Sequence, residues 1–375
     1  MRDIKQLFTA SAMLIGTTIG AGFLAIPYVV SQSGFFVGLF YLVFLGLVIL
    51  YLNLALGEIG LRTQGQHQLT GYAQRYLGKW GKRLMFFSMI FGIYAAILAY
   101  LTGVGNSLSY LFFNSIQYSL FFGILIWIIL SFFVFHGLEW LKKGMAYGSL
   151  IILILIVIFS FSYFSEVDYS NLTTFDSSSI FLPFGVIFFA YLGFSAMPEI
   201  QKSLFRKEYL LRRALILGVF VSFLVYSLFT LVMVGAYGIS VQEISTFSLG
   251  IIVIFLGVIT MCTSYFALSV ALKDMFSLDY QISKFNSWLV TTLVPLILFL
   301  IVNSTKIFSF SEIVSLGGSI SGGIAAILIL LMLPRSKHAG NRKPEYSIWT
   351  SSWILGLLCL IFILGIVYEI FAFLV

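Results

Sequence analysis

The stretch GTTIGAGFLAIP, residues 16–27, lies at the centre of an apolar run that extends over residues 7–31. A run of this length can cross a bilayer as a helix, which takes about 20 residues. Its centre nevertheless holds three glycines, two threonines and a proline, which lower helix propensity and remove a backbone donor. Irregular backbone at membrane depth is tolerated only where protein or a water-filled cavity surrounds it. We therefore predict a broken helix that holds a substrate or an ion; the alternative is a small-residue packing face, because Gly16 and Gly20 have the Gly-x-x-x-Gly spacing.

The composition is that of a polytopic membrane protein. Of the 375 residues, 60% are hydrophobic and only 9% are charged, against about 25% charged residues in soluble domains. The two cysteines, Cys262 and Cys359, lie inside apolar runs, and the three histidines are scattered. This pattern gives no disulfide framework, metal-binding spacing or catalytic constellation. We therefore expect neither an enzyme nor a bound cofactor.

Eleven apolar runs are long enough to cross the bilayer as helices. Their approximate limits are 7–31, 35–60, 84–113, 118–136, 141–165, 179–199, 210–236, 247–272, 285–303, 309–334 and 350–374. If the N-terminus is cytoplasmic, all of the 21 lysines and arginines except Lys306 fall on the cytoplasmic side. The positive-inside rule therefore predicts a multi-pass protein of the plasma membrane with its N-terminus inside and its C-terminus outside. The same bias explains the net charge of +7 without a nucleic-acid partner.

The loop over residues 61–83 is the longest one on the predicted inner side. Leu69, Tyr72 and Tyr76 alternate there with basic residues. This spacing suits a short amphipathic helix at the membrane interface. An ordinary solvated basic loop is the alternative.

Part of the opening stretch recurs as a similar motif in the sixth span. GFLAIP at residues 22–27 recurs as GFSAMP at residues 193–198, with four of six positions identical. Five spans separate the two copies, so the second unit would be inserted upside down. Inverted units that each contain a broken helix are typical of secondary transporters. We predict a first repeat over 1–165, a second over 166–334, and a loop with an extra helix over 335–375.

Broken helices expose two kinds of backbone end near the bilayer centre. Amides at a half-helix N-terminus suit a carboxylate, and carbonyls of an unwound segment suit a small cation. A substrate with an anionic group and an ammonium group, such as an amino acid, matches both ends.

Three segments make the chain resemble the amino acid permeases of the amino acid–polyamine–organocation superfamily, especially the hydroxy and aromatic amino acid permeases. They are residues 16–22 with Pro27, residues 99–105 (AYLTGVG) and residues 263–274 (TSYFALSVALKD). The resemblance implies the leucine-transporter fold and alternating access around a central site. Two features differ from the aromatic members. Ser195 follows Phe194 where those permeases usually have histidine, and their lysine deep in the fifth span is replaced here by Gly148 and Ser149.

The candidate substrate-binding residues come from the two breaks and from span 3. We expect backbone contacts from Thr18, Gly20, Ala21, Gly22, Tyr191, Gly193, Phe194 and Ser195. Tyr100 and Thr102 are second-rank candidates. The Tyr100 hydroxyl would cap the carboxylate or its ring would gate the pocket; an ordinary core tyrosine is the alternative.

The candidate ion site is a hydroxyl pair in span 8. Thr263 and Ser264 resemble the hydroxyl pair of a sodium site of the leucine-transporter fold, and that likeness adds the carbonyls of Gly16, Ile19 and Thr260. Oxygen ligands suit a hard cation such as Na+. Alternatively, the two hydroxyls bond back to carbonyls of their own helix. Phe23 stands where a second sodium site would need a side-chain amide.

Proton coupling normally needs an ionisable group inside the membrane. The sequence predicts none at mid-depth, because the ionisable groups in question sit near the predicted inner boundary, where interface anchors and inner ion pairs are expected. They are Glu58, His136, Glu139, Lys142, Lys143 and Glu199. This placement favours Na+ as coupling ion, whereas the family resemblance favours H+.

The sequence thus predicts a secondary active amino acid transporter that acts as a monomer in the lipid bilayer. A membrane amino acid sensor of the same fold is the alternative. Such sensors usually carry a soluble signalling segment, and the loops here are short. The identity of the amino acid is left open, because main-chain contacts bind the part that all amino acids share.

Overall fold

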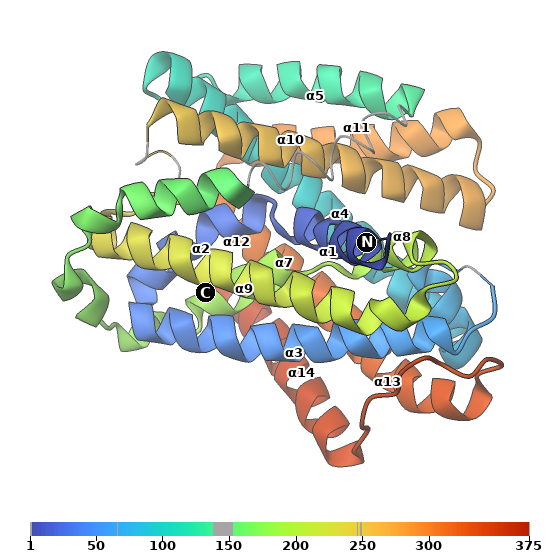
Figure 1. Ribbon diagram of the computed structural model, residues 1–375. Coiled ribbons are helices and arrows are strands. Elements are labelled where there is room, and N and C mark those ends of the chain that lie inside the picture. Colours follow the sequence, from blue (N-terminus) through green and yellow to red (C-terminus); the bar gives the residue numbers. More distant parts are fainter. Residues whose placement is uncertain (1, 66, 138–152, 246, 248–249, 375) are drawn as a thin grey trace.

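The computed structural model describes the whole chain except residues 1, 66, 138–152, 246, 248–249 and 375, and the described chain is helical (Figure 1). Within it, nine helices are long and apolar enough to cross a membrane, and ten if the bent pair at the N-terminus counts as one span. The predicted span 141–165 lies partly outside the described residues, and its described part is helical over Leu153–Ser162. The main helices are α1 (Arg2–Thr18), α2 (Ala21–Ser33), α3 (Phe35–Leu61), α4 (Leu69–Phe113), α5 (Ser119–His136), α7 (Leu182–Tyr191), α8 (Met197–Ser203), α9 (Leu211–Tyr237), α10 (Ile251–Asp274), α11 (Lys284–Thr305), α12 (Phe310–Leu316), α13 (Gly323–Ala339) and α14 (Ser352–Leu374).

The first span is broken where the sequence predicts. Helix α1 ends at Thr18, α2 begins at Ala21, and the two axes differ by 58°. Gly20 between them has φ −130° and ψ −141°, far from helical values. The break brings the backbone of Gly20 so close to α4 that an added Cβ would lie 2.9 Å from the Tyr100 hydroxyl. The absence of a Cβ at Gly20 therefore leaves room for the Tyr100 hydroxyl.

The sixth span is also broken. Helix α7 ends at Tyr191, Leu192 is extended, and a single 3₁₀ turn over Phe194–Ala196 leads into α8. Proline lies at the start of both α7 and α8, where its missing amide costs no helical bond. The prediction of a break in this span is confirmed.

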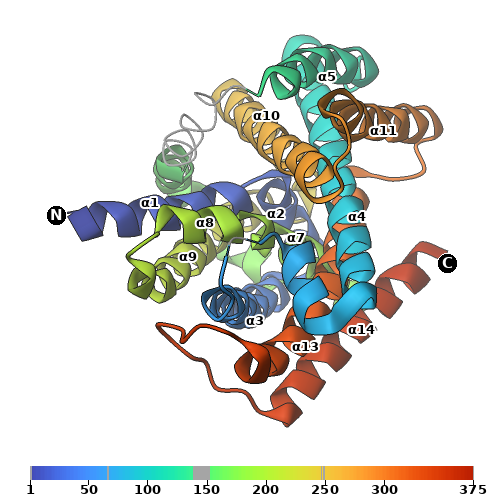
Figure 2. The same cartoon turned by 90° about the vertical axis from the view of Figure 1, so that its right-hand side faces the viewer.

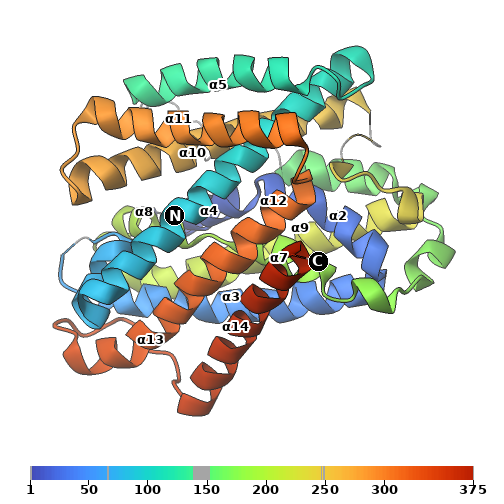
Figure 3. The ribbon, with the colours of Figure 1, turned by 180° about the vertical axis from the view of Figure 1, so that it is seen from behind.

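The broken helices occupy the middle of the bundle. Figure 2 shows α1, α2 and α7 surrounded by α3 and α9 on one side and by α4 and α10 on the other. Helices α5 and α11 lie outside α4 and α10, and α14 runs alongside α13 at the opposite edge (Figure 3). All elements that border the breaks are thus held by neighbours on several sides.

The loop over residues 61–83 contains the predicted short helix, which forms the first part of α4. Gly78, with φ +75°, marks the kink between this part and the spanning part. The side chains of Leu69, Tyr72 and Tyr76 are buried. Tyr72 donates a hydrogen bond to Gln201 of α8 at 3.2 Å, so the apolar face of this helix packs on protein.

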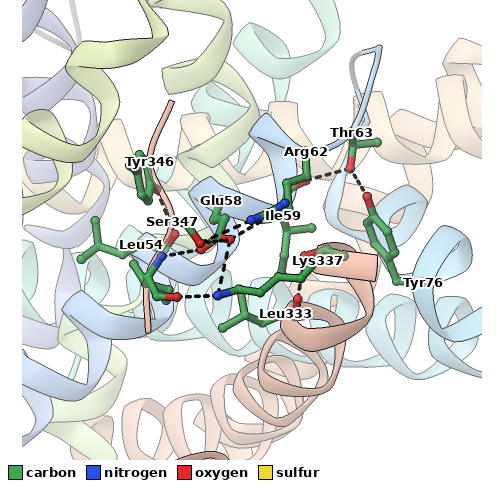
Figure 4. A network of polar contacts seen from close by, with 12 residues as sticks. Leu54, Glu58, Ile59, Arg62, Thr63, Tyr76, Leu333, Lys337, Tyr346 and Ser347 are labelled. Atoms are coloured by element: carbon green, nitrogen blue, oxygen red, sulfur yellow. Dashed lines mark hydrogen bonds and ion pairs between the residues drawn. The ribbon is translucent and has the colours of Figure 1, made fainter. Parts of the chain in front are cut away.

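A buried carboxylate fastens the end of α3 to the connection between α13 and α14. Glu58 is fully buried and accepts hydrogen bonds from Arg62 Nε at 2.8 Å, Ser347 Oγ at 2.9 Å and the Ile348 amide at 2.7 Å (Figure 4). Lys337 Nζ of α13 lies 3.8 Å from the same carboxylate. Cations thus balance the charge of Glu58, and hydrogen-bond donors satisfy its oxygens, as a buried carboxylate requires.

The tenth span contains a wide turn. Between α12 and α13, residues Gly317–Gly322 form a π-helical segment, a feature that occurs frequently at functional sites. An added Cβ at Gly318 would lie 2.3 Å from the carbonyl oxygen of Gly185 in α7. The glycines therefore allow this segment to pack directly on the backbone of the broken helix.

Candidate functional site

Two cavities meet at the breaks and share four lining residues, Thr17, Tyr100, Ser195 and Leu268. The first, of about 100 Å³, lies between α2, α4, α7 and the wide turn of the tenth span. The second, of about 230 Å³, follows α1 toward its N-terminal half and reaches Asp274 at the end of α10. The larger space therefore extends from the breaks toward the end of the bundle that carries the N-terminus.

Six of the ten candidate substrate residues line the first cavity. They are Thr18, Gly20, Gly22, Tyr100, Phe194 and Ser195. Gly20 and Gly22 flank the first turn of α2, whose N-cap is Gly20 and has no side-chain cap. Unpaired amides of a helix N-terminus carry partial positive charge and favour an anionic group. The Tyr100 hydroxyl faces the same backbone from α4.

The other four candidates do not line either cavity. Tyr191 is fully buried and donates to the Leu42 carbonyl of α3 at 3.2 Å. Gly193 packs against Leu14, whose Cδ1 would lie 2.6 Å from an added Cβ. Ala21 and Thr102 are buried as well. These four residues therefore belong to the packing around the site.

Tyr226 of α9 joins the two breaks, and the sequence analysis did not identify it. Its hydroxyl lies 2.8 Å from the Thr18 carbonyl and 2.9 Å from the Ala190 carbonyl. In unbroken helices, the amides of Gly22 and Phe194 would occupy these two positions. Thr18 also contacts α9 through its own hydroxyl, 3.0 Å from Ser222 Oγ. Tyr226 thus replaces helical hydrogen bonds that both breaks remove.

The candidate ion-binding residues are only partly brought together. Gly16 and Ser264 both line the second cavity, and the buried Ser264 hydroxyl faces the Tyr100 hydroxyl beside Gly20. Thr263 Oγ1 instead donates to the Thr260 carbonyl of its own helix at 2.9 Å. Ile19 lines neither cavity, and Thr260 borders a separate small cavity beside Phe23. No cluster of three or more histidines, cysteines or carboxylates occurs in the described part of the chain.

A further wall of the first cavity comes from small residues that the sequence analysis missed. Ser88 and Gly92 of α4 face Ser321 and Gly322 of the wide turn. Ser88 Oγ donates to the Ser321 carbonyl at 2.7 Å, and an added Cβ at Gly92 would lie 2.2 Å from Ser321 Oγ. The only sequence signal was the cluster of glycines and serines over residues 317–323.

Sequence comparison relates the chain to amino acid transport proteins. The tryptophan/tyrosine permease family matches residues 3–371. Glutamine transporter 2 of Aliivibrio fischeri is 25% identical over 258 residues, which cover 65% of this chain and 64% of that protein. Tyrosine-specific transport system 2 of Haemophilus influenzae is 33% identical over 106 residues, 28% of this chain and 26% of that protein. The chain therefore aligns with less than two thirds of either relative.

Structure comparison establishes the fold. The crystal structure of MhsT in complex with L-phenylalanine superposes with a TM-score of 0.67 at 16% identity, covering 96% of this chain and 98% of that one. A manganese transporter of Eremococcus coleocola superposes with a TM-score of 0.62 at 13% identity, covering 98% and 86%. The predicted all-helical, multi-pass leucine-transporter fold is thereby confirmed.

Proposed function

The chain belongs to the tryptophan/tyrosine permease family, and on that premise we propose that it carries an amino acid across the membrane by alternating access, driven by a gradient of Na+ or H+. The strongest support for this proposal is the geometry of the two breaks. Two broken helices end at a common cavity, and a single buried tyrosine hydroxyl contacts a carbonyl in the last turn of each. Such an arrangement offers amides and carbonyls to one ligand at membrane depth.

We assign the carboxylate of the substrate to the start of α2. The amides that follow Gly20 would bind it, with Tyr100 donating from α4. The ammonium would face the carbonyl ends of α1 and α7 and the turn at Phe194 and Ser195, where helix dipoles are negative. The remaining candidates would shape the backbone around these helix ends without contacting the substrate through their side chains. They are Ala21, Thr102, Tyr191 and Gly193.

We propose a neutral amino acid as substrate. Tyr100 is the only titratable side chain in the lining of the first cavity, and the rest of the described lining is apolar, hydroxyl-bearing or glycine. A charged substrate side chain would therefore have no counter-ion there, which is costly at membrane depth. The named relatives, a glutamine transporter and a tyrosine transport system, are consistent with a neutral side chain.

The orientation and the repeat organisation belong to the same proposal. The N-terminus would lie in the cytoplasm, so the larger cavity would open inward. Residues 1–165 and 166–334 would form the two inverted halves around the site, and residues 335–375 the additional helix and its loop. For Na+, the candidate oxygens are those of Gly16, Ile19, Thr260, Thr263 and Ser264, of which Gly16 and Ser264 line the second cavity.

Uptake of radiolabelled amino acids into proteoliposomes tests the proposal, with Na+ and H+ gradients imposed separately. We expect accumulation of at least one neutral amino acid under one of the gradients. Absence of uptake and of exchange for every amino acid would refute transport. Na+-dependent uptake that is lost in Thr263→Ala would support the assigned cation site, whereas uptake indifferent to Na+ and to this substitution would refute it.

A further inference from the structure

Glu369 is an ionisable residue inside α14 that the sequence analysis did not consider. It lies near the C-terminal end of the last spanning helix and is followed by the apolar residues IFAFLV. Its side chain is partly buried against the tenth span, where its Oε2 accepts a hydrogen bond from Ser319 Oγ at 3.2 Å. Ser319 belongs to the wide π-helical turn Gly317–Gly322.

No cation compensates this carboxylate within the described part of the chain. None of the ion pairs found there includes Glu369. The titratable groups that face it are Glu312 at the start of α12 and its own neighbour Tyr368. The charged residues of α13 begin at Arg335, at the other end of that helix, and the facing parts of α7 and of the wide turn carry no charge. An unpaired carboxylate at such a place is costly, and a bound proton removes that cost.

The surroundings of Glu369 connect it to the candidate substrate site. Ser319 is separated by one residue from Ser321 and by two from Gly322, and both of these line the first cavity. The hydroxyls of Ser315 and Ser319 both point at Gly185 of α7, within 2.1 and 2.6 Å of an added Cβ. Helix α7 in turn ends at the break beside the cavity, and α14 contacts α7, α12 and the wide turn (Figure 3). Only the residues of the tenth span therefore separate Glu369 from α7 and from the cavity wall. A change in the charge of Glu369 can thus alter the position of both.

We propose that Glu369 is the site at which the protein binds the proton that drives transport. The proposal rests on the proposed transport function and deepens it by naming the coupling ion. The carboxylate takes up one proton from the aqueous phase, and it becomes a neutral acid that keeps its hydrogen bond with Ser319. Release of that proton restores the charge, which alters the packing of α14 on the wide turn and on α7. Glu369 acts as a coupling residue and does not touch the substrate.

Proteoliposomes with Glu369→Gln test this inference, and Glu345→Gln is the matched control. Glu345 is exposed and pairs with Arg342 in the connection before α14, whereas Glu369 lies near the other end of that helix. In wild type and in the control, we expect a proton gradient alone to drive accumulation and amino acid addition to alkalinise a weakly buffered exterior. In Glu369→Gln, we expect accumulation to fall to the level reached without a gradient and alkalinisation to disappear. Exchange of labelled for unlabelled amino acid should persist, because exchange needs no net proton movement.

The outcomes separate this inference from the proposed function. If wild type neither accumulates nor exchanges any amino acid, transport itself is refuted. If wild type exchanges, but Glu369→Gln still accumulates under a proton gradient, Glu369 is not the coupling site. Accumulation by wild type with Na+ alone and without proton movement would likewise overturn the proposal. If Glu369→Gln does not fold, Glu369→Asp decides, because it retains a titratable group and should restore proton-driven accumulation with a shifted pH profile; an unshifted profile would contradict the proposal.

Discussion

Replacement of Tyr226 by phenylalanine removes one oxygen atom from the point where the two broken helices meet. The ring is fully buried and packs against Tyr191 with 5.2 Å between ring centroids. Phenylalanine keeps this ring contact and almost all of the volume. The substitution therefore isolates the hydroxyl that contacts the carbonyls of Thr18 and Ala190.

The expected magnitude follows from the hydrogen bonds that are lost. The hydroxyl carries one proton, so it satisfies one of the two carbonyls fully at any moment. The Thr18 carbonyl keeps a second partner, the Gly20 amide at 2.9 Å, whereas the Ala190 carbonyl depends on Tyr226 in place of a helical amide. Leaving one buried acceptor without a partner costs about 1–3 kcal/mol. If this energy holds the breaks in their binding geometry, affinity should fall by roughly 5- to 150-fold, since each 1.4 kcal/mol is tenfold.

Equilibrium binding of the transported amino acid to purified protein in detergent measures this loss. Tyr265→Phe is the matched control, because Tyr265 of α10 is also fully buried and its hydroxyl lies 3.4 Å from Ser131 Oγ, away from both breaks. We expect weaker binding in Tyr226→Phe and near-normal binding in Tyr265→Phe, with similar yields of folded protein. An affinity of Tyr226→Phe within twofold of wild type would refute the role assigned to the hydroxyl.

Two further substitutions test the fold and the opening stretch. Glu58→Ala should lower the free energy of unfolding by about 3–5 kcal/mol, because it removes the buried partner of the half-buried cations Arg62 and Lys337. Thermal unfolding in detergent measures this, with Glu345→Ala at an exposed position as control, and an unchanged midpoint would contradict it. Gly22→Leu should abolish binding while the protein still inserts, because an added Cβ would lie 2.7 Å from Ala190 Cα. Gly356→Leu, where nothing lies within 4 Å, is its control in the same binding assay, and normal binding by Gly22→Leu would refute the requirement for this close contact.

The breaks were predictable because they are encoded locally. Glycines and a proline at mid-span weaken a helix wherever it lies. The recurrence of the motif of residues 22–27 at residues 193–198 predicted the second break independently. The spans followed from length and apolarity in the same way. Start and end points were less predictable: α4 begins at Leu69 rather than near residue 84, because the short inner helix continues into the span across Gly78.

The side chains that contact the two breaks and the cavity wall could not be predicted from local sequence. Tyr226 is one of 20 tyrosines, and only the crossing of α9 over both breaks distinguishes it from core aromatics. Ser88 and Ser321 lie far apart in the chain and meet only through the packing of α4 on the wide turn. Glu369 was overlooked for a related reason. Its position near the end of a hydrophobic helix resembles that of an interface residue, and its contact with Ser319 depends on the tilt of α14.

The opening stretch shows why packing and binding need not be alternatives. Gly22 allows the backbones of α2 and α7 to meet at Ala190, as a packing glycine would. That close approach places the end of α7 beside the break at Gly20, so one tyrosine hydroxyl can reach both. Gly20 in turn leaves room for the hydroxyl of Tyr100 at the first turn of α2. A larger residue at Gly20 or Gly22 would push the start of α2 away from the end of α7, and the proposed site requires both. Close packing of α2 and α7 is therefore a condition for substrate binding. Substitutions in this stretch should therefore impair affinity in proportion to how far they push α2 from α7, rather than to the polarity that they introduce.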